Sequence, residues 1–194
     1  MFEFISTIDP VPTHSQSLSI TYPRTINIVY GYYPYMHDIH NFILEIKEKI
    51  SKEHSYTTNV RGGKTAWEEF KDHPFTFKFI KHCILKHQPT HPNIFKNFLS
   101  THFIVEAWAN EIKKNDFVNT HSHGHLHCIL YLTDGNPLIL PELNLKIHPQ
   151  PGNYYFFPPE ILHGVEKSTS EKNRYNLVLN IEEIPTWKRP SNKS

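Results

Sequence analysis

The chain has 194 residues and a formal net charge of +1, with 20 basic and 19 acidic side chains. This length suits one folding domain, and the near balance of charge gives no indication of a nucleic-acid partner or an anionic membrane surface. No apolar run is long enough to cross a membrane, and the N-terminal segment lacks the pattern of a secretory signal. We therefore expect a cytoplasmic protein. Histidine is the unusual component, with 15 residues.

The first half of the chain predicts strands followed by helices. Residues 17–33 are β-branched and aromatic with a proline inside, which predicts one or two strands at a sheet edge. Residues 36–53 place apolar side chains on one stripe, as in an amphipathic helix. The segment NVRGGKTAW, residues 59–67, predicts a turn or loop, and residues 74–87 and 92–100 predict two further helices.

From residue 102 the pattern changes to short strands separated by turn signals. These strands include FIVEAWANEI, LHCILYL, NYYFF and YNLVLNIEE. Such a pattern predicts an antiparallel barrel or jelly roll, with the helices packed on one outer face. We expect a mainly β fold with supporting strands and helices in residues 1–100, the barrel core in 101–185 and a flexible tail in 186–194.

Two cysteines, Cys83 and Cys128, fall in a predicted helix and a predicted strand. They could form one bridge, but such surroundings are typical of a reduced intracellular protein. We therefore expect two free, buried thiols.

The segment NTHSHGHLHCILYL, residues 119–132, carries histidines at alternate positions. Because successive side chains of a strand point to opposite faces, His121 and His123 should point the same way and could converge on one metal ion. Neutral imidazole suits iron, zinc, copper and nickel. A solvated histidine run on a surface strand is the alternative interpretation.

A third candidate ligand lies in PGNYYFFPPEILHGV, residues 151–165. A turn at Pro151 and Gly152 opens a short strand, a proline pair ends it, and His163 follows. In a barrel, this strand can return beside the one that carries the histidine pair. The sequence therefore predicts a metal site formed by His121, His123 and His163.

Arg174 opens the strand RYNLVLNIEE and shares a face with Asn176. An arginine that points into a barrel needs an anion, because burying an unpaired charge is costly. A guanidinium binds a carboxylate through two parallel hydrogen bonds. The alternative is a surface ion pair with an acid of the protein.

In this order, these motifs resemble the core of iron(II)/2-oxoglutarate-dependent oxygenases, in particular small oxygenases of phages and bacteria that are distant kin of prolyl hydroxylases. The segments that carry the resemblance are HSH (121–123), PGNYYFFPPEILHGV (151–165), RYN (174–176), WAN (108–110), ILYL (129–132) and NVRGG (59–63). It covers roughly residues 55–182. The resemblance implies a double-stranded β-helix, bound Fe(II), 2-oxoglutarate and O2 as co-substrates, and hydroxylation of an unknown substrate.

The resemblance also implies roles for individual residues. Arg174 would bind the distal carboxylate of 2-oxoglutarate, with Tyr131 and Asn176 completing the co-substrate site. The residues assigned to the substrate pocket are Trp108, Asn110, His125, His127 and Arg61. Trp108 could instead be a core residue, and the two histidines could be hydrogen-bond partners of the ligands or plain structural residues. The NVRGG segment could act as a lid, with Arg61 or Lys64 touching the substrate.

One departure from the family concerns its metal ligands, which are usually two histidines and one carboxylate. The carboxylate position is His123 here. His123 could be a true ligand; Glu106 could supply a carboxylate; or His125 could ligate through a turn at Gly124. Strand alternation favours the first alternative.

Two other functions fit parts of the pattern. A cupin-type three-histidine enzyme that does not use 2-oxoglutarate would match the spacing from Asn115 through His127 and from Gly152 to His163. A non-enzymatic barrel could bind a ligand or hold structural zinc. Arg174 discriminates, since a cupin needs no carboxylate-binding residue there. We expect a small-molecule or peptide substrate, no nucleic acid and no membrane; a homodimer and a virus-encoded origin are compatible with the sequence.

Overall fold

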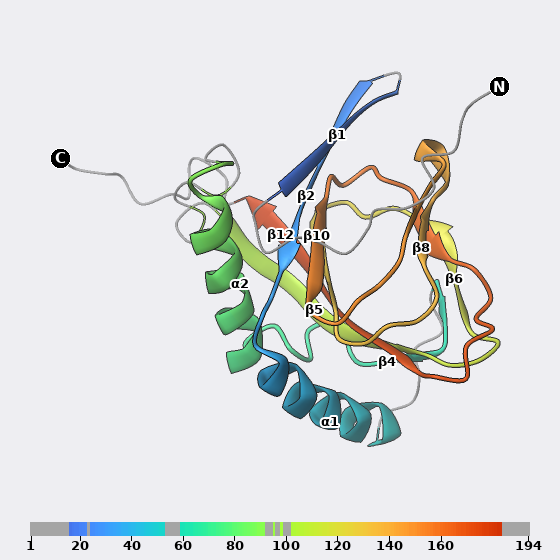
Figure 1. Cartoon of the computed structure of the whole chain (residues 1–194). Helices are drawn as coiled ribbons and strands as arrows, with labels where there is room; N and C mark the ends of the chain where they lie inside the picture. The colour runs from blue at the N-terminus through green and yellow to red at the C-terminus, as the bar shows by residue number, and fades with distance from the viewer. Residues whose placement is uncertain are drawn as a thin grey trace.

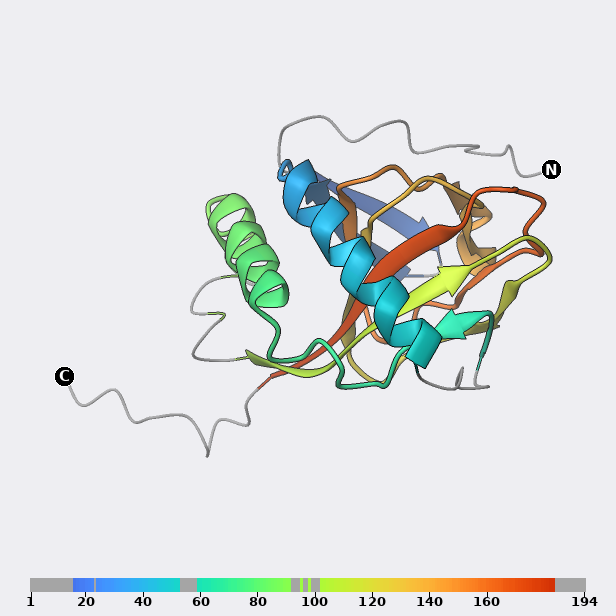
Figure 2. The ribbon, with the colours of Figure 1, turned by 90° about the horizontal axis from the view of Figure 1, so that it is seen from below.

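The computed structural model describes residues 16–22, 24–52, 59–91, 95, 98 and 102–183. Two antiparallel sheets face each other and two helices cover the larger sheet (Figures 1 and 2). In spatial order, the larger sheet contains β1 (Gln16–Tyr22), β2 (Arg24–Tyr32), β10 (Asn153–Phe157), β7 (Leu126–Tyr131), β12 (Arg174–Glu183), β5 (His102–Ile112) and β4 (Gly63–Lys64). The smaller sheet contains β3 (Val60–Arg61), β6 (Phe117–His121), β11 (His163–Val165), β8 (Leu138–Leu140) and β9 (Leu145–Ile147). This is the predicted mainly β jelly-roll architecture, a double-stranded β-helix.

The larger sheet is buried on both faces because its strands alternate between two apolar clusters. In β7, Cys128 and Leu130 pack toward the helices, whereas Ile129 and Tyr131 point between the sheets. Since each buried apolar side chain contributes roughly 1.5–3 kcal/mol, both faces stabilise the sheet. The side chains that line the barrel interior are therefore held on a sheet that is supported from behind.

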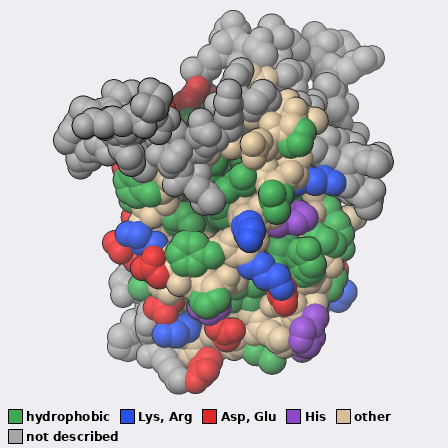
Figure 3. Space-filling model, turned by 90° about the vertical axis from the view of Figure 1, so that its left-hand side faces the viewer, with side chains coloured by type: hydrophobic (Ala, Val, Ile, Leu, Met, Phe, Trp, Pro, Cys, Tyr) green, Lys and Arg blue, Asp and Glu red, His purple; other side chains and the backbone are tan. Residues whose placement is uncertain are grey.

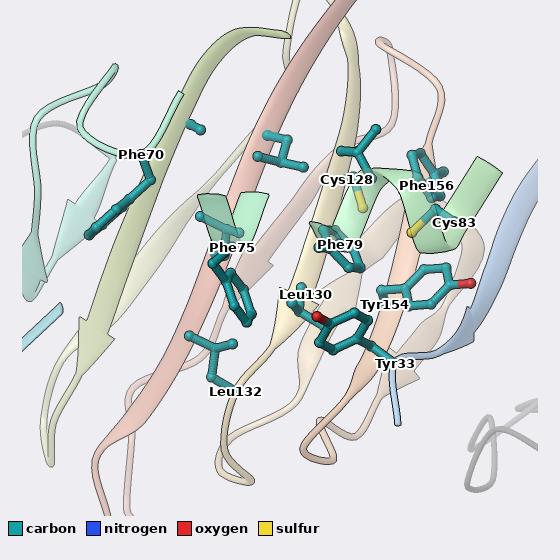
Figure 4. Packing of buried hydrophobic residues seen from close by; sticks show 14 of the residues in the cluster. Tyr33, Phe70, Phe75, Phe79, Cys83, Cys128, Leu130, Leu132, Tyr154 and Phe156 are labelled. Carbon is teal, nitrogen blue, oxygen red and sulfur yellow. The ribbon is translucent and has the colours of Figure 1, made fainter. Parts of the chain in front are cut away.

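The helices α1 (Met36–Lys52) and α2 (Pro74–His87) supply that support. Figure 4 shows Phe79 and Cys83 of α2 close to Cys128 of β7 and Tyr154 of β10. The predicted bounds of α2 are confirmed. Its start follows from Pro74 at the first turn and from the His73 ring, which accepts a hydrogen bond from the Phe75 backbone amide at 3.2 Å.

Of the other predictions for the first half of the chain, some are confirmed and others fall on residues that the structure does not describe or stay untested. The strands predicted in 17–33 are confirmed as β1 and β2, and the helix predicted at 36–53 is confirmed as α1. The helix predicted at 92–100 lies outside the described residues, except for the buried Phe95 and Phe98. The division of the chain at residue 100 stays a prediction.

The segment NVRGGKTAW is the predicted turn or loop only in part, because four of its nine residues belong to strands. It forms β3 and β4, which pair with β6 and β5 and so belong to different sheets. Gly62 allows this crossing, because a Cβ at this position would lie 2.6 Å from the Glu111 carbonyl oxygen. Two-residue strands are held by pairing rather than by a side-chain pattern, which explains why the sequence did not predict them.

The remaining predictions concern the two cysteines and membrane-spanning segments. Cys83 and Cys128 are free and buried, as predicted. Among the described helices, none is long and apolar enough to cross a membrane. Figure 3 shows the side of the molecule that carries the helices, where hydrophobic, basic and acidic side chains are interspersed.

Candidate metal centre

Three histidines come together where the smaller sheet meets the loops at its end. His121 ends β6 and His163 begins β11, and the two residues are direct partners in the antiparallel register. His123 lies beyond the end of β6, where its backbone amide donates a hydrogen bond to the Pro159 carbonyl at 3.1 Å. The loop before β11 therefore holds His123 beside the other two.

The three rings can supply nitrogen ligands to one ion. One ligand atom from each residue lies within 4.8 Å of the others, and the ring centroids of His121 and His163 are 4.5 Å apart. Around a metal with bonds of about 2 Å, ligand nitrogens lie roughly 3–4 Å apart. Small adjustments of the three side chains would therefore bring their nitrogens to bonding distance from one ion.

Backbone carbonyls set the tautomers of two of these rings. Nδ1 of His121 donates to the Asn119 carbonyl at 2.8 Å, and Nδ1 of His163 donates to the Ile161 carbonyl at 3.0 Å. Because a carbonyl oxygen only accepts, Nδ1 carries the proton and Nε2 keeps a lone pair for a metal.

The same histidines are held in their neutral form. Burial lowers the pKa of His123 to about 3 and that of His163 to about 4, and it also lowers the pKa of His121. Neutral imidazole is the metal-binding state, so at neutral pH the site is ready for a cation without first losing protons.

His127, predicted to line the substrate pocket, lies behind this set at the start of β7. Its ring centroid is 4.6 Å from those of both His123 and His163, and the ring stacks on Phe157 at 5.0 Å. It is fully buried, and neither nitrogen has a hydrogen-bond partner among the described residues. His127 is not a member of the group of three, so it packs against the candidate ligands.

The alternative ligands Glu106 and His125 are not part of the group either. In the described part of the chain, the group contains no carboxylate. Glu106 instead accepts a hydrogen bond from the Asn180 side-chain amide at 2.6 Å. The geometry thus agrees with the alternative in which His123 is the third ligand, although metal binding itself stays a prediction.

Arg174 points into the barrel, as the alternation of β12 predicts. Its side chain is only 2% exposed. One guanidinium nitrogen, Nη1, donates to the Asn136 carbonyl at 3.0 Å, whereas Nε has no partner in the described structure. No described acid forms an ion pair with it, which argues against the surface-pair alternative.

The other two residues assigned to the co-substrate site lie beside Arg174. The Tyr131 ring centroid is 5.1 Å from the Arg174 Cζ, and burial raises the pKa of Tyr131 to about 12. Its hydroxyl lies near the Arg174 guanidinium but makes no hydrogen bond of regular geometry among the described residues. Asn176 accepts a hydrogen bond from Asn110 at 3.0 Å. A neutral phenol and a guanidinium with an unused donor are suited to an incoming carboxylate.

One pocket joins the histidines to Arg174. It is also lined by Asn176 and by two predicted substrate residues, Trp108 and Asn110. His125, His127 and Arg61, which were assigned to the same pocket, do not line it, and Arg61 is exposed. Arg61 lies on the edge strand β3 next to Val60, which is buried and lines the pocket, so the alternation of side chains directs Arg61 to the opposite face.

The lining residues that were not assigned to the site include Lys64 and Trp67. The sequence placed both in the NVRGGKTAW segment, and Lys64 was considered only as part of a lid. A lysine directly after two glycines was the available signal. Its position inside the pocket depends on the pairing of β4 with β5, which the sequence does not reveal.

The fold is the double-stranded β-helix found in 2-oxoglutarate/iron(II) oxygenases. A Pseudomonas putida prolyl-4-hydroxylase has a TM-score of 0.62 at 13% identity, over 81% of this chain and 93% of that one. The viral collagen prolyl hydroxylase of Paramecium bursaria Chlorella virus-1, in its 2OG complex, has a TM-score of 0.58 at 14% identity, over 80% and 96%. HygX from Streptomyces hygroscopicus, with nickel and 2-oxoglutarate bound, has a TM-score of 0.56 at 10% identity, over 82% and 83%.

These similarities establish a shared fold. No family model matches the sequence, and no curated protein matches it. The activity must therefore be argued from the site itself.

Proposed function

We propose that the chain is a non-haem Fe(II)/2-oxoglutarate-dependent dioxygenase that hydroxylates a small-molecule or peptide substrate. The observation that carries this proposal is the pocket shared by the three histidines and the buried, acid-free Arg174. Solved structures with the same fold support it, since one of them is described with nickel and 2-oxoglutarate bound.

The donor set fits such a metal. His121, His123 and His163 would hold the ion through neutral nitrogens, and imidazole is a suitable ligand for iron. The bound metal supplies the activation of O2 for insertion of oxygen into a C–H bond. The chain keeps the ligands neutral, fixes the orientation of two rings through backbone carbonyls and shields the site between two sheets.

Arg174 fits the distal carboxylate of the co-substrate. A guanidinium buried without an acid is costly, and burial lowers its pKa. A carboxylate that binds Arg174 and accepts a hydrogen bond from the Tyr131 hydroxyl would satisfy both groups at once. The protein thus provides a place for one end of 2-oxoglutarate, while the other end can reach the histidine set in the same pocket.

The test is anaerobic addition of 2-oxoglutarate to the Fe(II)-loaded chain. We expect the weak visible charge-transfer band of a metal-chelated 2-oxo acid, and we expect Arg174→Gln to lose the band at moderate 2-oxoglutarate concentrations while still binding iron. Arg61→Gln is the matched control, because Arg61 is exposed and does not line the pocket. The proposal is wrong if iron binds but no band forms in the wild-type chain.

A second candidate is a cupin-type enzyme that does not use 2-oxoglutarate. The observation that favours it is the group of three neutral nitrogen ligands without a carboxylate in the described residues. Iron binding without a charge-transfer band, and identical behaviour of the wild type and Arg174→Gln, would be the expected result for that enzyme.

A further inference from the structure

Lys64 is a buried amine in the same pocket. Burial lowers its pKa to about 7, and the negative charge of Glu106 opposes this shift in part. It ends β4 and pairs with Asn110 of β5. Its side chain is 1% exposed, and Nζ has no hydrogen-bond partner among the described residues. The next residue anchors this backbone, because the Thr65 amide donates to the Ala109 carbonyl and the Thr65 hydroxyl accepts from the Ala109 amide, both at 3.1 Å. The ammonium is therefore positioned by the sheet.

Two tryptophans surround the Lys64 ammonium. Nζ lies 2.6 Å from the Trp67 ring centroid and 5.0 Å from that of Trp108, and the two rings meet edge to face at 4.6 Å. A ring face attracts a cation but accepts no ordinary hydrogen bond. Since an ammonium has three N–H donors, those of Lys64 remain available to a ligand.

The charge of the pocket is one-sided. Its ionisable lining consists of Lys64, Arg174 and the three histidines, with no acid among the described lining residues. In the proposed function, one carboxylate of 2-oxoglutarate would lie at the divalent metal, and the other would bind Arg174. Lys64 would then be the cation of the pocket that has no anionic partner among the lining residues or in the co-substrate.

The rest of the lining is largely apolar. It includes Val60, Val118, Ile129, Leu138 and Val178. Such a wall favours a ligand that is mostly hydrocarbon, with one anionic group for one ammonium. A phosphate, which carries more charge and needs several donors, would be less well matched.

We propose that the substrate hydroxylated in this pocket is a mostly apolar carboxylic acid, whose carboxylate is bound by the Lys64 ammonium while Trp67 and Trp108 flank its carbon skeleton. This inference rests on the proposed function. It assigns Lys64 a substrate-binding role and divides the two buried cations between two carboxylates, Arg174 for the co-substrate and Lys64 for the substrate.

The test uses the full chain loaded with Zn(II), which is redox-inactive, and saturated with 2-oxoglutarate. The probes are butyrate and its neutral analogue butyramide, titrated by calorimetry and by tryptophan fluorescence. We expect butyrate to bind at least tenfold more tightly than butyramide. Lys64→Met should weaken butyrate binding at least tenfold, Lys64→Arg should retain most of it, and the exposed control Lys146→Met should leave it unchanged.

A second measurement needs no variant at the site. In the wild-type chain labelled with 15N at lysine Nζ, butyrate should raise the pKa of Lys64 by at least one unit, and butyramide should leave it unchanged. This titration of the wild-type chain tests the inference even if Lys64→Met fails to fold.

Three results would overturn the inference. The first is that butyrate binds no more tightly than butyramide, or does not bind at tens of millimolar. The second is that a folded Lys64→Met binds butyrate as the wild type does. The third is that Lys64→Met loses as much 2-oxoglutarate affinity as Arg174→Gln. The last result would assign Lys64 to the co-substrate. Failure of 2-oxoglutarate to bind the metal-loaded wild type would instead contradict the proposed function.

Discussion

His121 and His163 are register partners on adjacent strands, and each turns Nδ1 to the backbone carbonyl of the residue two positions earlier. In both residues, this hydrogen bond to the backbone directs Nε2 away from the strand that carries the ring. Because the acceptor belongs to the backbone, this bond orients both candidate ligands before any metal arrives. This relationship makes the metal site testable residue by residue.

Replacing His163 with alanine should weaken metal binding by roughly a hundredfold or more, since loss of a ligand exceeds the effect of losing a supporting hydrogen bond. Calorimetric titration with Fe(II) under anaerobic conditions, or with Ni(II), measures this. His148→Ala is the control, because His148 is exposed and lies outside the group of three. An unchanged affinity in His163→Ala would remove the site.

The identity of the third ligand can be decided by comparing two variants. His123→Ala should weaken metal binding strongly, whereas Glu106→Gln should change it less than threefold, because Glu106 bonds to Asn180 and is not in the metal-capable group. His123→Asp should retain binding, since a carboxylate is a normal ligand at such a site. The reverse ranking of His123→Ala and Glu106→Gln would assign the ligand role to the carboxylate.

Arg174→Gln should raise the 2-oxoglutarate concentration needed for half-saturation by at least about thirtyfold, the effect expected when one partner of a buried charged pair worth about 2 kcal/mol or more is removed. Metal affinity should stay within threefold of the wild type. The measurement is a 2-oxoglutarate titration of the metal-loaded protein. Equal losses of metal and 2-oxoglutarate affinity would indicate general damage to the pocket.

His87 should make the stability of the metal-free chain depend on pH. Burial lowers its pKa to about 4, and its ring bonds to the Tyr154 hydroxyl at 2.8 Å. Below pH 6.5 the unfolded chain binds a proton that the folded chain accepts only near pH 4. Stability from His87 is therefore present above pH 6.5 and lost as the pH falls toward 4.

Urea unfolding at pH 7.5 and pH 5.0 checks this effect. The wild type should lose up to about 2 kcal/mol more between the two pH values than His87→Gln, since one pKa unit corresponds to about 1.4 kcal/mol. The other histidines are common to both proteins and cancel in the comparison. The same pH dependence in both would show that His87 does not contribute.

Local patterns predicted a supporting helix and one strand of the site. Pro74 after His73 marked the start of α2, and the alternation of β12 placed Arg174 and Asn176 on the interior face opposite Tyr175. The sequence also predicted that His123 and His121 bind the same metal, but on the assumption that both lie in one strand, which the structure corrects. His123 lies after β6 rather than in the strand, and its bond to the Pro159 carbonyl holds it in place.

The sequence by itself determined which residues could do the chemistry, because helix and strand periods are properties of neighbouring residues. Only the tertiary structure decided which of them meet. The register of β6 and β11 joined His121 to His163, and the pairing of β4 with β5 moved Lys64 from an expected lid into the pocket while Arg61 stayed outside. Such pairings join segments far apart in the chain through backbone hydrogen bonds, which every residue type except proline can form, so no local pattern encodes them.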